Sequence, residues 1–167
     1  MRYTLSRWVR RAPRPVLSAA VFFAIAFVMN NSGLQNVGGA WKVVDHSSNM
    51  IWVLARGSAL AFGAFYPFIS AFMGLFGGFI SGSEASTIAM FTKYHLLTSR
   101  MLNVNALVVT AATAIGGGLA SVISPAKLQN AAATIDALGI ESRVIRTAFL
   151  ISVLITVVAA MIALIVA

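Results

Sequence analysis

The sequence predicts an all-α integral membrane protein, in which membrane-spanning helices accompany a re-entrant helical hairpin and a broken helix. The composition is 59% hydrophobic and only 10% charged, with a mean hydropathy of +0.89, beyond the range of soluble domains. Apolar segments of roughly 20 residues, the length that crosses a bilayer core, recur along the chain. Two of these segments are interrupted by glycine, serine and proline instead of by charge. Irregular backbone of that kind is tolerated at membrane depth only where protein or a water-filled cavity surrounds it.

Residues 1–14 are expected to form a basic segment in the cytoplasm, ahead of a membrane domain over residues 15–167. Five arginines lie in "MRYTLSRWVRRAPRP" and contribute to a net charge of +8. Arginines beside a membrane segment mark its cytoplasmic side, so the charge indicates orientation and not nucleic-acid binding. The stretch also resembles a signal peptide, but "VMNNSG" offers no A-x-A-like cleavage site. We therefore interpret it as leading into a retained first helix.

The first two parts of the membrane domain are a span over residues 15–32 and an external interfacial segment over residues 33–56. Pro15 suits the start of a helix and Gly33 suits its end. The second part is mixed in polarity and contains two tryptophans, a residue type enriched at membrane interfaces. With the N-terminus inside, this segment is predicted to lie outside.

Residues 57–98 are predicted to form the re-entrant hairpin. The chain is apolar from position 57 to position 80, and small residues recur at every fourth position, as expected for a face on which another helix packs closely. These residues are Ser70, Gly74, Gly78 and Gly82. The polar "SGSEAST" then separates this arm from a second arm that is too short to cross the membrane alone. The polar run is therefore predicted to be the hairpin tip.

Residues 103–138 are predicted to form a broken span, and residues 144–167 a final span. Three consecutive glycines, Gly116 to Gly118, each cost about 1 kcal/mol in a helix relative to alanine, so we expect the helix to break there. Ser124 and Pro125 suit the start of its second half. The final span is uncharged and follows two arginines, which places its start inside and the C-terminus outside.

Two helix starts inside a membrane would direct unpaired N–H groups and positive dipole ends at one small volume, which favours an anion. We expect Ser83 to cap the second hairpin arm and Ser124 to cap the second half of the broken span. Discontinuous helices around a midplane site are typical of secondary transporters. The residues thus point to transport of a small anion.

Glu84 is the acid of the central apolar region, and a carboxylate at that depth is a functional candidate. It is predicted either to carry a coupling proton or to form a structural pair with Lys127. Lys127 is itself predicted either to meet a substrate carboxylate or to extend to water. His95, beside Tyr94 and Lys93, is expected at the interface.

No enzyme is predicted. The chain has no cysteine, and its two histidines do not have the spacing of metal ligands. Neither a G-x-S-x-G elbow, a phosphate loop nor a carboxylate pair for acid–base catalysis is present. No metal or cofactor is expected, and the coupling ion is expected to be H⁺.

The chain resembles the C-terminal part of the L-lactate permease family. Three stretches carry the resemblance, namely "MNNSGL", "GLFGGFISGSEASTIAMF" and "GGGLASVISPAKL", in this order and spacing. It implies proton-coupled uptake of lactate, glycolate and similar 2-hydroxy monocarboxylates across the cell membrane. It also implies a fold of two inverted repeats, each with a hairpin and a broken helix, of which this chain supplies one.

The resemblance assigns a substrate site to the hairpin tip and the broken helix. By position, the matching residues are Gly82, Ser83, Glu84, Ser86, Thr87, Gly116, Gly117, Ser124 and Pro125, with Lys127 as the nearest cation. The family usually has Asp where Glu84 stands, Asn where Ile88 stands, and a Lys near Ser121. These departures leave a different organic anion as an alternative substrate.

The expected partners are a small carboxylate substrate and the lipid bilayer, with no nucleic acid. A second chain carrying the missing N-terminal repeat, or self-association, would complete the site. The alternative is a truncated or non-transporting membrane subunit, a remnant of such a permease.

Overall fold

The computed structural model describes residues 13–137 and 139–167, apart from the side chains at positions 14, 15, 18 and 19, and it is mostly helical. The predicted basic segment 1–14 lies almost wholly outside the described residues, as does the predicted end of the broken span at position 138. The elements are α2 (Pro13–Asn31), β1 (Leu34–Val37), β2 (Ala40–Val43), η1 (His46–Ser48), α3 (Met50–Phe62), η2 (Gly63–Phe65), α4 (Tyr66–Ser81), α5 (Glu84–Leu102), α6 (Ala106–Ile123), α7 (Pro125–Thr134) and α8 (Glu141–Val166).

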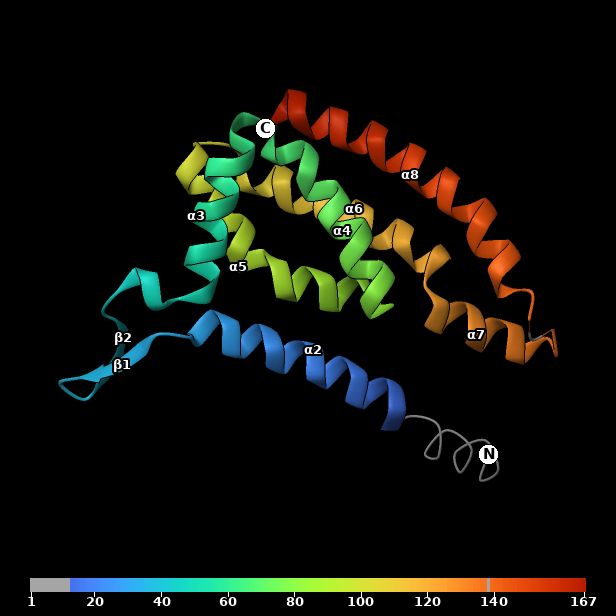
Figure 1. The fold of residues 1–167 in the computed structure, drawn as a ribbon, viewed down its shortest axis with the longest axis horizontal. Coiled ribbons are helices and arrows are strands. Elements are labelled where there is room, and N and C mark those ends of the chain that lie inside the picture. The colour runs from blue at the N-terminus through green and yellow to red at the C-terminus, as the bar shows by residue number, and fades with distance from the viewer. Residues whose placement is uncertain (1–12, 138) are drawn as a thin grey trace.

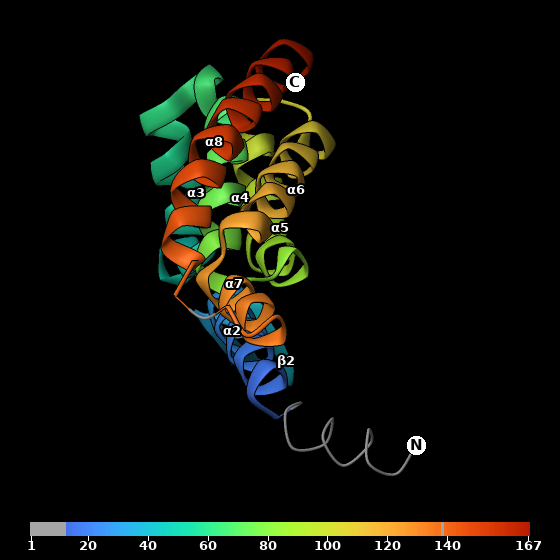
Figure 2. The ribbon, with the colours of Figure 1, turned by 90° about the vertical axis from the view of Figure 1, so that its right-hand side faces the viewer.

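The long helices lie side by side along the longest axis of the molecule (Figure 1). From one side to the other, α8 is followed by α4 and α6, then by α5, then by α2, and the view turned by 90° shows the same order (Figure 2). α4 packs against α6, and α8 covers this pair. Helix α3 stands across one end of the arrangement and contacts α5 (Figure 1).

Three helical stretches are long and apolar enough to cross a membrane, namely Met50–Ser81, Ala106–Ile123 and Glu141–Val166. Among the described residues of α2, Ala20–Asn31 forms a shorter apolar helix. The expectation of a mostly helical, multi-pass membrane protein is confirmed at this level. Re-entrant insertion and the orientation of the termini stay predictions.

Helix α8 buries small residues and exposes large ones, the reverse of a helix in a soluble protein. Ser152, Thr156, Ala160 and Ala163 recur on its buried face, whereas Leu154 and Ile165 are 67% and 79% exposed. Small residues let helices approach closely, and large apolar side chains are at home in lipid. The sequence pattern of α8 therefore fits a membrane span packed on one face.

The predicted interfacial segment 33–56 contains structure that the sequence analysis did not predict. Strands β1 and β2 form an antiparallel hairpin, with a two-residue turn at Gly38 and Gly39, where φ is 63° and 82°. Two successive positive φ values favour glycine and match the right-handed twist of a hairpin. Beyond it, hydrogen bonds from the Ser47 hydroxyl and amide hold the pKa of the exposed Asp45 below its usual value. Helix α3 begins at Met50, inside the predicted segment.

The stripe of small residues on α4 is a helix contact face, as predicted. A Cβ on Gly74 would overlap the carbonyl oxygen of Thr113, and one on Gly78 would lie 2.7 Å from the carbonyl oxygen of Gly117. From the opposite side, a Cβ on Gly116 would overlap the carbonyl oxygen of Ala71. The backbones of α4 and α6 thus touch, because only glycine leaves room for the approach.

The predicted break at Gly116–Gly118 is wrong, whereas the predicted start of the second half at Ser124 and Pro125 is confirmed. Helix α6 runs without interruption from Ala106 to Ile123, and the chain breaks at Ser124, whose ψ is 121°. Close packing of Gly116 and Gly117 on α4 offsets the cost of three glycines in a helix. Pro125 disfavours the helical conformation of the residue before it and lacks an N–H, so the break falls about two turns later.

The predicted hairpin tip is confirmed as the end of one helix and the start of the next. α4 ends at Ser81, and Gly82 takes the left-handed conformation with φ 64°. Ser83 then caps α5, since its Oγ accepts a hydrogen bond of 3.3 Å from the amide of Ser86. α5 returns alongside α4 and α6.

Candidate functional site

Two interruptions of the helical backbone lie against each other. One is at Gly82, between α4 and α5, and the other is at Ser124, between α6 and α7. A Cβ on Gly82 would stand 2.9 Å from Ser124 Oγ and 3.8 Å from the Cβ of Ala126. The hairpin tip therefore lies directly against the junction of α6 and α7, the two segments that were predicted to face one small volume. Glycine at position 82 is required both by its positive φ and by this close approach.

Hydroxyl groups hold the tip in shape. Ser81 Oγ accepts from the amide of Ser83 at 3.1 Å and donates to the carbonyl of Ser83 at 3.0 Å. Thr87 Oγ1 donates to the same carbonyl at 2.9 Å. Thr87 is fully buried and Ser86 is 3% exposed. Of the predicted site residues, Thr87 thus stabilises the turn, and Ser83 starts the returning helix.

The second helix start is built differently from the first. Ser124 stands at the N-cap position of α7, but its side chain makes no capping bond, contrary to the prediction. In the described part of the chain, Ser124 Oγ is buried and has no hydrogen-bond partner, and it faces Gly82. Pro125 opens α7 at a position where the missing N–H costs nothing. A buried hydroxyl without a partner is costly, so Ser124 Oγ is a candidate hydrogen-bonding group at this contact.

Glu84 and Lys127 both border this contact. The Glu84 side chain lies over α6, with Cγ 3.7 Å from the Cβ that Gly117 would carry and Oε2 3.5 Å from that of Gly118. Glu84 is exposed and occupies the first turn of α5, where the helix dipole favours a negative charge. Lys127 is also exposed, and its Nζ donates to Ser121 Oγ at 2.8 Å.

The structural pair of Glu84 with Lys127, one of the two predicted alternatives, does not form in the part of the chain that the structure describes. Gly116 is buried in the α4 contact and is a packing residue. The structure therefore brings together Gly82, Ser83, Glu84, Gly117 and Ser124, with Pro125 and Lys127 beside them. Thr87 and Gly116 support the site from behind.

Sequence reasoning missed a buried polar cluster. His95 is not at an interface but fully buried, with Nδ1 2.6 Å from Tyr66 Oη and Nε2 2.8 Å from Thr113 Oγ1. The available signal was a polar face on α5, where Thr87, His95 and Thr98 follow at helical spacing and all are fully buried. Polar residues in membrane helices generally face the protein interior.

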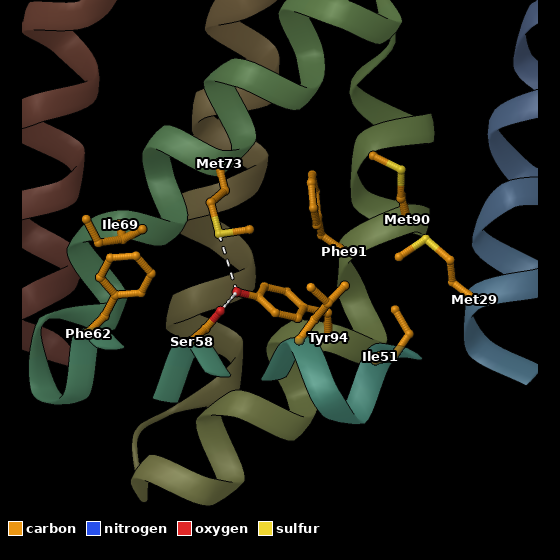
Figure 3. A pocket seen from close by; sticks show the side chains of 10 residues that line it. Met29, Ile51, Ser58, Phe62, Ile69, Met73, Met90, Phe91 and Tyr94 are labelled. Carbon is orange, nitrogen blue, oxygen red and sulfur yellow. Dashed lines mark hydrogen bonds between the residues drawn. The ribbon is translucent and has the colours of Figure 1, made fainter. Parts of the chain in front are cut away.

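An apolar cavity of about 400 Å³ lies elsewhere, between α2, α3, α4 and α5 (Figure 3). In its wall Tyr94 Oη donates to Ser58 Oγ at 2.6 Å and stands 3.7 Å from Met73 Sδ. None of the predicted site residues and no charged residue lines it. It does not suit a carboxylate. Among the described residues, no group of three or more acidic, His or Cys side chains has the arrangement of a metal site.

The chain is similar to known membrane permeases. The family model described as L-lactate permease matches residues 3–167. The chain is 33% identical over 132 residues to the glycolate permease GlcA of Escherichia coli, covering 79% of this chain and 20% of the relative. It is 29% identical over 144 residues to the L-lactate permease of Salmonella typhi, covering 86% of this chain and 23% of the relative.

The L-lactate permease of Bacillus subtilis is 25% identical over 138 residues, covering 83% of this chain and 22% of the relative. The chain thus spans about a fifth of the length of the curated relatives it matches. No solved structure matches.

Proposed function

The chain belongs to the L-lactate permease family, and we propose that it forms the C-terminal part of a secondary active transporter for small 2-hydroxy monocarboxylates. Lactate and glycolate are the proposed substrates, since these acids appear in the names of its relatives. The observation that carries the proposal is the contact of the hairpin tip with the α6–α7 junction, at Gly82 and Ser124.

The groups at this contact match the chemistry of a 2-hydroxy acid. A carboxylate is favoured at helix starts, where N–H groups lack helical acceptors. Lys127 supplies a positive charge, and its ammonium stands at Ser121, near which the family usually has a Lys. The unpartnered Ser124 hydroxyl is suited to hydrogen-bond the 2-hydroxyl or the carboxylate of the substrate. A relocated cation thus serves the same site.

Proton symport is proposed through Glu84. The carboxylate makes no ion pair in the described part of the chain, lies at the tip, and would be neutral when protonated. A proton and a substrate anion that bind together cross the membrane without net charge, which lowers the cost of passage through lipid. Since the chain is far shorter than its relatives, a second chain with the missing repeat, or a further copy of this chain, is proposed to complete the site.

Transport is tested in membrane vesicles that contain the chain together with the polypeptide encoded upstream. Labelled L-lactate should accumulate when an inward proton gradient is imposed, and glycolate should compete. Propionate, which lacks the hydroxyl of lactate, should compete at least tenfold less well, because a polar group built for that hydroxyl would be left unpaired. Failure of these vesicles to take up either acid would favour the non-transporting remnant, and uptake of an unrelated anion alone would favour another substrate.

The proposed orientation places the N-terminus in the cytoplasm and the C-terminus outside the cell membrane. The amide of Asn105 donates to the carbonyl of Ala167 at 3.0 Å, so the start of α6 and the end of α8 lie at one face. Lys127 follows the other end of α6, and Arg143 and Arg146 lie in the first two turns of α8, where the positive-inside rule expects the cytoplasm.

Orientation can be measured because the chain has no cysteine of its own. A Val166→Cys variant should react with a membrane-impermeant maleimide added to intact cells. An Arg143→Cys variant should react only after the cells are permeabilised. The opposite pattern would invert the proposed topology.

A further inference from the structure

The buried cluster around His95 joins the two arms of the hairpin to α6. His95 on α5 contacts Tyr66 at the start of α4 through Nδ1, and Thr113 in the middle of α6 through Nε2. Thr113 Oγ1 also lies 2.9 Å from the carbonyl oxygen of Ser70 on α4 and 3.1 Å from that of Val109. All three side chains are at most 1% exposed.

The available donors and acceptors fix the positions of the protons in this cluster. The single hydroxyl proton of Thr113 is directed to a main-chain carbonyl, which accepts only, so Thr113 Oγ1 must accept from His95 Nε2–H. Nδ1 then carries a lone pair and accepts from the hydroxyl of Tyr66. Both ring nitrogens are satisfied in the neutral form, whereas a second proton on Nδ1 would require the Tyr66 hydroxyl to turn its own proton to another acceptor.

The α6 side of the cluster offers no route for a proton. On the α6 side it ends at carbonyl oxygens, and beside it Thr98 Oγ1 also donates to a carbonyl, that of Tyr94. The titratable groups packed around His95 are the phenols of Tyr66 and Tyr94. The neighbouring cation, Lys93, donates to the carbonyl of Asn30 on α2 instead. No carboxylate in the described residues bonds to the cluster.

The cluster and the tip lie at two ends of one helix contact. Along α4 and α6, Ser70 and Gly74 meet Thr113, Gly78 meets Gly117, and Gly82 meets Ser124. Thr113 and Ser124 are eleven positions apart in sequence, which corresponds to about 16 Å along a helix. The register of this whole contact is set at its base by the bond of Thr113 to Ser70 and by His95, which ties in the second arm.

We propose that His95 is a positioning residue: as the neutral Nε2–H tautomer it clamps α4, α5 and α6 into one unit, and so holds the hairpin tip against Ser124. The clamp keeps its proton throughout and is distinct from the coupling carboxylate. The proposal depends on the proposed function only for what the tip does. Its tests read the tautomer and the tip directly, so they remain decisive even if the chain transports nothing.

The tautomer is read by nitrogen NMR of the full chain, labelled at histidine and held in lipid nanodiscs. His95 should show one protonated and one unprotonated nitrogen, with the proton on Nε2, at every pH from about 5 to about 8. His46, the other histidine, is exposed and stacks on Trp52, and it provides the signal of a water-accessible imidazole. A second proton on His95 in this range, or a proton on Nδ1 alone, would overturn the proposal.

The position of the tip is read by electron paramagnetic resonance, with spin labels on cysteines introduced at Ala85 and Ala126. Both positions are exposed, and they flank the contact of Gly82 with Ser124. His95→Leu keeps the bulk but removes both hydrogen bonds, so the dipolar coupling between the labels should weaken and its distance distribution should broaden. His95→Gln keeps a neutral donor and a neutral acceptor and should restore the parent spectrum.

A second variant guards against a failure of His95→Leu to fold. Thr113→Val removes only the hydroxyl and retains the shape of the side chain, and it should broaden the same distribution. An unchanged distribution in folded Thr113→Val or folded His95→Leu protein contradicts a clamp. Equal broadening in His95→Gln and His95→Leu would also contradict the clamp, because the effect would then depend on the imidazole and not on neutral hydrogen bonding.

Discussion

Glu84→Gln is expected to lower the accumulation of lactate driven by a proton gradient at least tenfold relative to the parent chain. The amide has the size of the carboxyl group but cannot take up a proton. The substitution should leave the local structure unchanged, because Glu84 forms no ion pair in the described residues and its side chain lies over Gly117 and Gly118. The measurement is uptake of labelled lactate into vesicles with the completing polypeptide present.

Exchange of lactate across the same membrane, without a pH difference, separates coupling from binding. It should persist in Glu84→Gln, because exchange needs the substrate site but no net proton movement. Glu141→Gln serves as the matched control, since Glu141 lies in the first turn of α8 and its carboxylate accepts from the amide of Gly139 at 2.7 Å. Full gradient-driven accumulation by Glu84→Gln would show that Glu84 serves only to stabilise the helix start.

Gly74→Ala is expected to destabilise the fold by about 3 kcal/mol, the upper part of the range for overpacking. The added Cβ would overlap the carbonyl of Thr113, a main-chain atom that cannot turn aside, so α4 must shift away from α6. The shift would also weaken the bond of Thr113 to Ser70. The midpoint of thermal unfolding of the purified chain in detergent is the measurement.

Gly57→Ala is the control for this substitution. Gly57 lies inside α3 and has nothing within 4 Å of an added Cβ, so alanine there should stabilise by up to about 1 kcal/mol through helix propensity. Gly116→Ala acts on the same contact from the side of α6, and the double variant with Gly74→Ala should lose less than the sum of the two. If Gly74→Ala unfolds at the same midpoint temperature as the parent chain, the close approach of α4 and α6 contributes little to stability.

Much of the outline of the fold could be read from local sequence. The hydropathy of α8 is continuous, and its uncharged run predicted a span without reference to any other segment. Gly82 and Ser83 predicted the end of one helix and the start of the next, because a left-handed residue and a capping hydroxyl act within a few positions. The stripe on α4 also identified a contact face, since small residues at that spacing have few other uses in a membrane.

Other features depend on what lies across from a residue. Gly116 weakens an isolated helix, but in this protein it is the position at which α6 touches Ala71, and the helix continues through it. His95 has the same sequence neighbours as an interface residue. Its hydrogen bonds to Tyr66 and Thr113 offset the free-energy cost of burying its ring nitrogens. The Gly38–Gly39 turn of the β1–β2 hairpin is a local signal that the prediction of an interfacial segment did not use.

The sequence by itself determined the membrane class, the apolar segments, the C-terminal end of α4 and the family, because hydropathy, turn chemistry and motif order are local properties of the chain. Only the tertiary structure decided that the glycines of α6 stay helical, so that the interruption is confined to Ser124, and that Gly82 contacts Ser124 directly. It also placed His95 in a buried cluster. The physical reason is that contact between α4, α5 and α6 contributes free energies comparable to helix propensity and to the burial of a polar group, and these contacts join residues far apart in sequence.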